Sequence, residues 1–139
     1  MHTEYEQAVE RGLHRYVKLV AEAVGLAGNA YYAQTHPRAE AYLALDLRLP
    51  VFPELDTALL WDEGDGWALA VEPGAGADLA IVTYLAAPDP VPPPTVVAAF
   101  AKAACDGIPA GEPQPHPPEA GAADRLAAYA AELPAEDLW

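Results

Sequence analysis

Apolar side chains recur at spacings of three and four over the first 25 residues of the chain. This period predicts an amphipathic helix that packs one side against a core. Thr3 and Glu6 form a capping box at its start, and Gly25 suits the left-handed residue that ends it. Gly12 costs about 1 kcal/mol relative to Ala inside a helix, so packing must stabilise that turn. The apolar positions are Tyr5, Val9, Leu13, Tyr16, Val17, Val20 and Val24.

From residue 31 to residue 85 the apolar period changes to two, which predicts strands. In the clearest of them, leucines at 43, 45, 47 and 49 alternate with other residues until Pro50 closes the run. This alternation predicts a half-buried strand over 43–49. Further strands are predicted over 30–34, 57–61, 67–71 and 79–85. Their short connections favour an antiparallel meander.

Residues 57–61 and 67–71 are predicted to be the two arms of a hairpin. An Asp-Gly dipeptide between them is typical of a two-residue turn, but that turn would place Asp62 opposite Leu69 on the apolar side. A three-residue loop over 63–65 instead places Trp61 opposite Trp67. We predict the longer loop because cross-strand aromatic pairs stabilise a sheet.

A proline-rich connector, a second helix and an extension complete the chain. Pro94 suits the first position of a helix that ends at Gly107. Residues 109–118 contain five prolines, which is typical of an extended linker. Residues 122–133 form a short alanine-rich helix that docks on the domain, binds a partner or frays.

Together these elements predict an α+β fold. We expect an antiparallel meander of about five strands with N- and C-terminal helices packed on one face. The predicted division of the chain is an α+β domain over residues 1–108, a proline-rich linker over 109–118, and a short helix with an acidic tail over 119–139.

Several segments resemble an uncharacterised family of small acidic proteins from high-GC bacteria, a domain of unknown function. They are AYLALD at 41–46, LLWDE at 59–63, GWALAVE at 66–72, and RGL at 11–13 followed by Tyr16 and Val17. The resemblance covers about residues 10–105 and implies a bacterial origin and a fold, but no activity and no site. The order of helix, meander and helix also resembles the small dimeric chaperones of bacterial secretion systems, by fold alone.

The net charge of −14, from 21 acidic and 7 basic residues, argues against two kinds of partner. Nucleic acids and anionic membranes both need clustered Lys and Arg. No apolar run approaches the about 20 residues of a membrane helix, and the amino terminus is unlike a signal peptide. A single cysteine allows no intramolecular disulfide. We therefore expect a cytoplasmic protein that binds neither nucleic acid nor membrane.

The residue types that carry catalysis or bind metals are sparse. The chain contains no serine, which excludes a Ser-His-Asp triad. Its histidines, at 2, 14, 36 and 116, lack ligand spacing. Cys105 precedes Asp106 near a helix carboxy terminus, the opposite of a nucleophile's setting. The acidic patch at 62–65 lacks the spacing of a calcium loop. We expect no metal and no cofactor, and these features weigh against an enzyme.

Our leading hypothesis is a non-enzymatic protein-interaction module, adaptor-like or chaperone-like. It would present one sheet face or the carboxy-terminal arm to a protein partner, with a second copy of the chain as one candidate. The candidate partner-binding residues are Tyr42, Trp61, Trp67 and Trp139.

Two alternatives belong to other functional classes. One is a small-molecule-binding domain or enzyme, whose site lies between sheet and helices and uses Tyr31, Tyr32, Asp46, Arg48 and Tyr84. A minor alternative is an acidic mimic of nucleic acid, which needs carboxylates in a row. The ten acidic residues between positions 29 and 90 are scattered instead.

Overall fold

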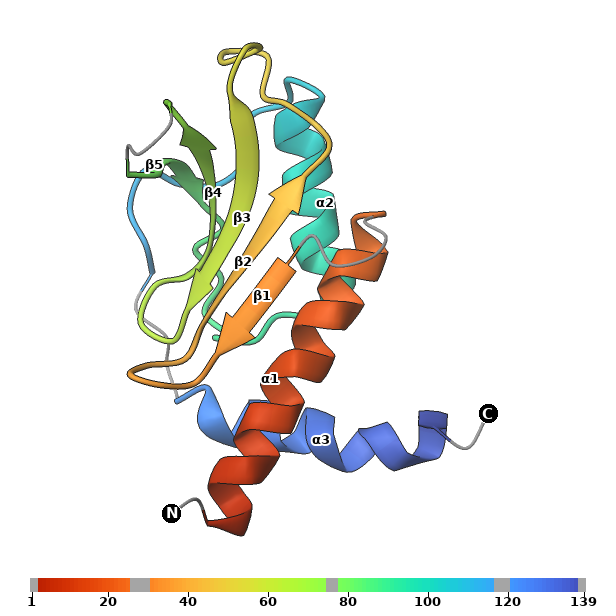
Figure 1. Cartoon of the computed structure of the whole chain (residues 1–139). Helices are drawn as coiled ribbons and strands as arrows, with labels where there is room; N and C mark the ends of the chain where they lie inside the picture. The colour runs from red at the N-terminus through yellow and green to blue at the C-terminus, as the bar shows by residue number, and fades with distance from the viewer. Residues whose placement is uncertain (1–2, 26–30, 75–77, 117–120, 138–139) are drawn as a thin grey trace.

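The computed structural model describes residues 3–25, 31–74, 78–116 and 121–137 (Figure 1). The five strands form one antiparallel sheet in chain order, which confirms the predicted α+β class and meander. The elements are α1 (Glu4–Ala23), β1 (Tyr31–Gln34), β2 (Glu40–Leu45), β3 (Asp56–Asp62), β4 (Gly66–Glu72), β5 (Ala80–Tyr84), α2 (Pro94–Cys105) and α3 (Ala123–Asp137).

The ends of α1 follow the predicted capping chemistry. The Glu6 amide donates to Thr3 Oγ1 at 3.0 Å, and Gly25 has a φ of +88°. Most of the predicted apolar stripe is buried, but Tyr5 is 49% exposed. The Tyr5 hydroxyl instead donates to Asp124 Oδ1 at 2.5 Å. The first turn of α1 therefore contacts α3 by a hydrogen bond rather than by burial.

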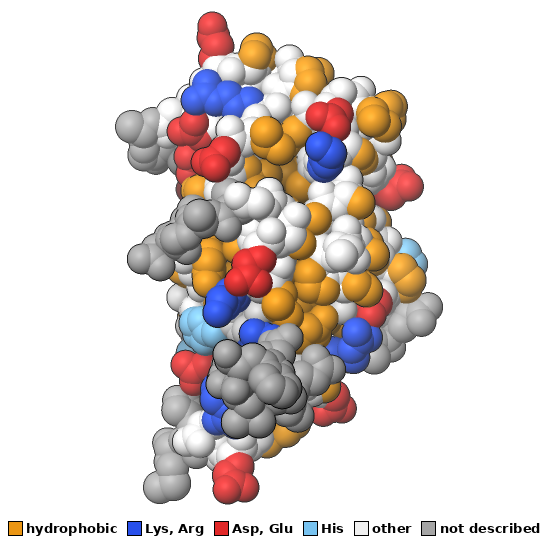
Figure 2. Space-filling model, turned by 90° about the vertical axis from the view of Figure 1, so that its right-hand side faces the viewer, with side chains coloured by type: hydrophobic (Ala, Val, Ile, Leu, Met, Phe, Trp, Pro, Cys, Tyr) orange, Lys and Arg blue, Asp and Glu red, His pale blue; other side chains and the backbone are white. Residues whose placement is uncertain are grey.

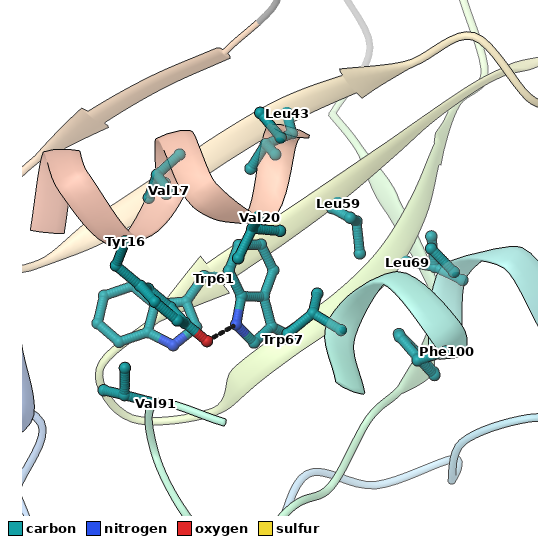
Figure 3. Close-up of a cluster of buried hydrophobic side chains, with 14 of the residues drawn as sticks. Tyr16, Val17, Val20, Leu43, Leu59, Trp61, Trp67, Leu69, Val91 and Phe100 are labelled. Atoms are coloured by element: carbon teal, nitrogen blue, oxygen red, sulfur yellow. Dashed lines mark hydrogen bonds between the residues drawn. The ribbon is translucent and has the colours of Figure 1, made fainter. Parts of the chain in front are cut away.

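Side chains from the three helices and from the central strands β2, β3 and β4 form one hydrophobic core, part of which is shown in Figure 3. The strand residues that face this core include Leu43, Leu59 and Leu69. Trp61 lies opposite Trp67, and residues 63–65 form the loop between them, so the predicted hairpin register is confirmed. Asp62 Oδ1 accepts the amides of both Gly64 and Asp65 at 2.7 Å, which explains why this loop is favoured.

The predicted strand over 43–49 is wrong at its end, because β2 stops at Leu45. Leu45 pairs with Thr57, and the ladder with β3 goes no further. Arg48 instead bonds the loop that follows, donating to Pro53 O at 3.1 Å and to Asp56 Oδ1 at 2.9 Å. The leucine alternation continues past the point where a partner strand exists.

The connector between β5 and α2 contains prolines at 88, 90, 92 and 93, and Pro94 begins α2. Prolines have no N–H to donate. Its backbone carbonyls accept hydrogen bonds from side chains of three different elements. Trp61 Nε1 donates to Pro90 O at 2.9 Å, Tyr16 Oη donates to Pro92 O, and Arg125 Nη2 donates to Val91 O at 3.2 Å. The connector is thereby held against α1, β3 and α3.

Helix α3 docks on α1, one of the three outcomes that the sequence leaves open. Leu126 is fully buried, and its backbone carbonyl lies so close to Gly12 that an added Cβ would stand 1.6 Å from the oxygen. Arg125 pairs with Asp89 at 2.6 Å. The preceding segment bonds to the edge of the sheet, where Glu112 and Tyr84 exchange backbone hydrogen bonds at 2.7 and 2.8 Å.

We predict that Tyr16→Phe destabilises the fold by about 2–4 kcal/mol, because it removes the donor to Pro92 O and the acceptor of Trp67 Nε1. Urea unfolding followed by tryptophan fluorescence measures this loss. Tyr5→Phe is the control, since that hydroxyl is exposed, and it should cost less than about 1 kcal/mol. Equal losses in the two variants would contradict the buried role of Tyr16.

We predict that Gly12→Ala destabilises the protein by about 2 kcal/mol, although Ala is the better helix former. The added methyl group would collide with the Leu126 carbonyl. Gly121→Ala is the control, because nothing lies within 4 Å of its added Cβ. A Gly12→Ala protein as stable as the wild type in urea would show that α3 does not pack this closely.

Candidate functional site

The sheet residues that alternate with the core positions form the second, outer face of the sheet. One row of this face crosses all five strands through the pairs of the ladder. In chain order the row contains Tyr32, Tyr42, Leu60, Ala68 and Tyr84. Three tyrosines and two aliphatic side chains therefore lie side by side on the outer face.

This row lines a groove of about 230 Å³, which we call the outer groove. Its apolar walls include Tyr32, which is 54% exposed, and Ile81, which is 45% exposed. Carboxylates of Glu40, Asp62 and Asp65 line one end. The outer groove thus combines exposed tyrosines, a small aliphatic floor and an acidic end.

Tyr42 lies diagonally across the sheet. Its hydroxyl donates to Glu72 Oε1 at 2.9 Å. Tyr42 shares a row with Ala68 of β4, and Glu72 lies four residues further along that strand. The ring must therefore pass over β3 near Ala58, which is fully buried. It also stacks on Tyr32, with ring centroids 5.7 Å apart and planes 24° apart.

Burial, then the hydrogen bond and the negative charge of Glu72, raises the pKa of Tyr42 to about 12. The hydroxyl is therefore protonated at neutral pH and acts as a donor. Together the hydrogen bond and the stacking fix the position of this ring in the free protein.

The structure separates the four predicted partner-binding residues. Tyr42 lies on the outer face, as part of the outer groove. Trp61 and Trp67 are 2% and 1% exposed, and their indole N–H groups donate to Pro90 O and Tyr16 Oη. Both are core residues; Trp61 also belongs to the lining of the outer groove, but with 2% of its surface exposed it offers a partner almost no side-chain contact. Trp139 lies outside the described residues.

The second predicted set does not converge on one site. Tyr32 and Tyr84 line the outer groove, Tyr31 lines a hollow along α1, and Asp46 lines another hollow. Arg48 is paired with Asp56 at 2.9 Å. Sequence reasoning therefore named all three groove tyrosines but divided them between two hypotheses and combined them with residues from elsewhere, and it missed Leu60 and Ile81.

The hollow of Asp46 lies between α1, α2 and the end of β2, and its volume is about 210 Å³. Alanines of α2 form much of its lining, and Asp46 and Lys102 contribute charge. Figure 2 shows the side of the molecule on which these helices lie, with apolar side chains near its centre and acidic and basic side chains dispersed around them. The hollow brings no set of polar groups together.

Among the described residues, no group of three or more His, Cys, Asp or Glu side chains is placed to hold a metal ion. Cys105 is half-buried, and burial followed by the charge of Asp106 raises the pKa of its thiol. A protonated thiol is a poor nucleophile. None of the helices in the described ranges is long and apolar enough to cross a membrane.

We predict that Tyr42→Phe costs about 1 kcal/mol of stability at pH 8 and progressively less as the pH rises from 10 to about 12. The folded-state pKa of Tyr42 is raised, so its contribution is complete below the unfolded value of 10 and is lost as the hydroxyl ionises. Urea unfolding of both proteins across this range measures the difference. A difference that stays constant with pH would contradict the raised pKa of Tyr42.

Comparison with known proteins places the chain in a family. No curated protein and no solved structure matches it. The model of a family of unknown function (DUF6292) matches residues 16–103, a stretch that contains all five strands and the residues of the outer groove. The predicted resemblance to a family of unknown function is confirmed, while the bacterial origin stays a prediction. The chain belongs to this family of unknown function, DUF6292.

Proposed function

We propose that the protein is a non-enzymatic interaction module, an adaptor or chaperone of the bacterial cytoplasm, that binds a partner protein through the outer groove. The observation that carries this proposal is the row of tyrosines and aliphatic side chains across the outer face, in which Tyr32 is 54% exposed, together with the neighbouring Ile81, which is 45% exposed. Exposed aromatic and aliphatic side chains that lie together beside a groove suit contact with a partner protein.

The residues of the outer groove favour a protein partner over a small molecule. Tyrosine is enriched at protein interfaces, because it offers a rigid apolar ring with a polar tip. The volume of about 230 Å³ is below the range of about 300–1,000 Å³ that small-molecule sites usually occupy. The groove residues come from four neighbouring strands and from β1 at the edge, which suits an extended contact.

The outer groove is also largely rigid before binding. The stacked pair of Tyr32 and Tyr42 is anchored by the hydrogen bond to Glu72, and the strands beneath belong to a sheet whose opposite side is in the core. A surface that is already ordered loses little conformational entropy on binding. This rigidity supports recognition of a partner by the sheet face.

The carboxy-terminal arm is the weaker of the two surfaces considered from the sequence. Leu126 of α3 is fully buried in the same core as Leu13 and Tyr16, so a chain shortened to residue 108 would expose core residues. The experiment therefore uses the full-length chain.

We predict that a photo-crosslinking residue, p-benzoylphenylalanine, forms a covalent adduct with a partner when it replaces Tyr32 in cells that make the protein. The same residue at Val51, which is 72% exposed and lies outside the groove, is the control and should give no such adduct. Adding Ile81→Glu, on the facing groove wall, should abolish the adduct at position 32. Mass spectrometry of the adduct identifies the partner, and an adduct with a second copy of the chain would identify a homodimer.

Equal adducts from positions 32 and 51 would indicate random collisions and overturn the proposal. So would the absence of an adduct at position 32 in a protein shown to be folded by circular dichroism. Activity of the purified protein on a metabolite would overturn the non-enzymatic part.

A further inference from the structure

We infer that the segment bound in the outer groove carries an arginine, whose guanidinium group lies against the carboxylates of Glu40 and Asp65 while the adjoining apolar atoms pack on Leu60 and the tyrosine rings of the groove. This inference rests on the proposed function and specifies the chemistry of the partner.

The geometry of the outer face places acidic and apolar groups in adjacent rows. Tyr42 pairs with Leu60, and Glu40 pairs with Asp62 in the next row of the same face. Rows of one face are two residues apart, which corresponds to about 7 Å along the strands. Asp65 of the β3–β4 loop lines the same end of the groove. A single long side chain lying along the groove therefore reaches from the apolar row to the carboxylates.

The charges at this end are not balanced within the protein. The residues that line the outer groove, all from the described part of the chain, include three carboxylates and no Lys, Arg or His. Arg38 pairs with Asp62 at 3.2 Å and neutralises that carboxylate in part. Glu40 accepts a hydrogen bond from the uncharged amide of Gln34, so its negative charge remains. A cationic group on the partner completes this end of the groove.

Arginine fits the groove better than lysine does. Its planar guanidinium stacks on aromatic rings and donates two parallel hydrogen bonds to a carboxylate, whereas an ammonium group is a compact charge that is more strongly hydrated. The tyrosines of the groove supply the rings, and Glu40 and Asp65 supply the carboxylates. The methylene stem of arginine packs on apolar surface, which Leu60 and the ring of Tyr32 provide. The net charge of −14 also attracts cationic segments over long range.

The test is a titration of the ¹⁵N-labelled full-length protein with the capped peptide Gly-Leu-Arg-Leu-Gly, followed by NMR. The matched peptide carries citrulline, which keeps the planar shape of arginine without its charge. We expect amide shifts at Leu60, Ala68 and Tyr84, and affinity lower by about tenfold or more for the citrulline peptide.

Two double variants distinguish the effect of charges in the outer groove from the effect of the overall charge. Glu40→Gln with Asp65→Asn removes two charges from the groove and should lower the affinity for the arginine peptide by about tenfold. Glu22→Gln with Glu54→Gln removes two charges from exposed positions outside it and should change the affinity by about twofold or less. Each variant retains a side chain of the same shape, so folding is preserved.

Equal weakening by the two double variants, or amide shifts spread over α1 and α2, would overturn the inference in favour of unspecific attraction. Equal binding of the arginine and citrulline peptides in the groove would overturn the role of charge and leave the proposed function standing. The cross-link from position 32 does not depend on an arginine in the partner. Absence of this cross-link would therefore overturn the proposed function itself, which the peptide titration does not test.

Discussion

The fold depends on how the carbonyl groups of the proline-rich connector are satisfied. In residues 90–94 the only backbone N–H belongs to Val91, and it donates to Asp89 Oδ1 at 2.9 Å. The connector cannot form a ladder, and buried carbonyls without donors are costly. Donors from α1, β3 and α3 converge on three successive residues, Pro90, Val91 and Pro92. These hydrogen bonds place three elements around one segment and explain why Tyr16 and Trp61 carry polar atoms into an apolar core.

The two faces of the sheet carry side chains of different size, and this difference creates the outer groove. On the core face, Trp61 and Trp67 fill the space beneath α1 (Figure 3). On the outer face the groove row has the small side chain of Ala68 on β4, between Leu60 of β3 and Tyr84 of β5. A small side chain between larger ones leaves a hollow. The buried aromatic rings of the core and the partly exposed tyrosine rings of the outer groove therefore lie on opposite faces of the sheet.

The matched family stretch, residues 16–103, coincides with the connector, its donors in α1 and β3, and the outer groove. The contact between α1 and α3, by contrast, depends on residues outside this stretch. Gly12 and Leu126, which make its closest approach, both lie outside that stretch. Arg125, which bonds Val91 and Asp89, lies outside it as well. The central unit and the α3 contact thus depend on different parts of the sequence.

The sequence by itself determined the local structure of this protein. Spacing and turn chemistry predict the apolar stripe of α1, its capping box and the pairing of Trp61 with Trp67. These features depend on interactions between residues that are close in the sequence. The tertiary structure decided where β2 ends, that α3 docks, and which aromatic residues stay exposed. Apolar residues occur on both faces of the central strands, since Leu43 alternates with Tyr42 and Leu59 with Leu60. Alternation assigns residues to two faces, but only packing against the helices selects the face that is buried.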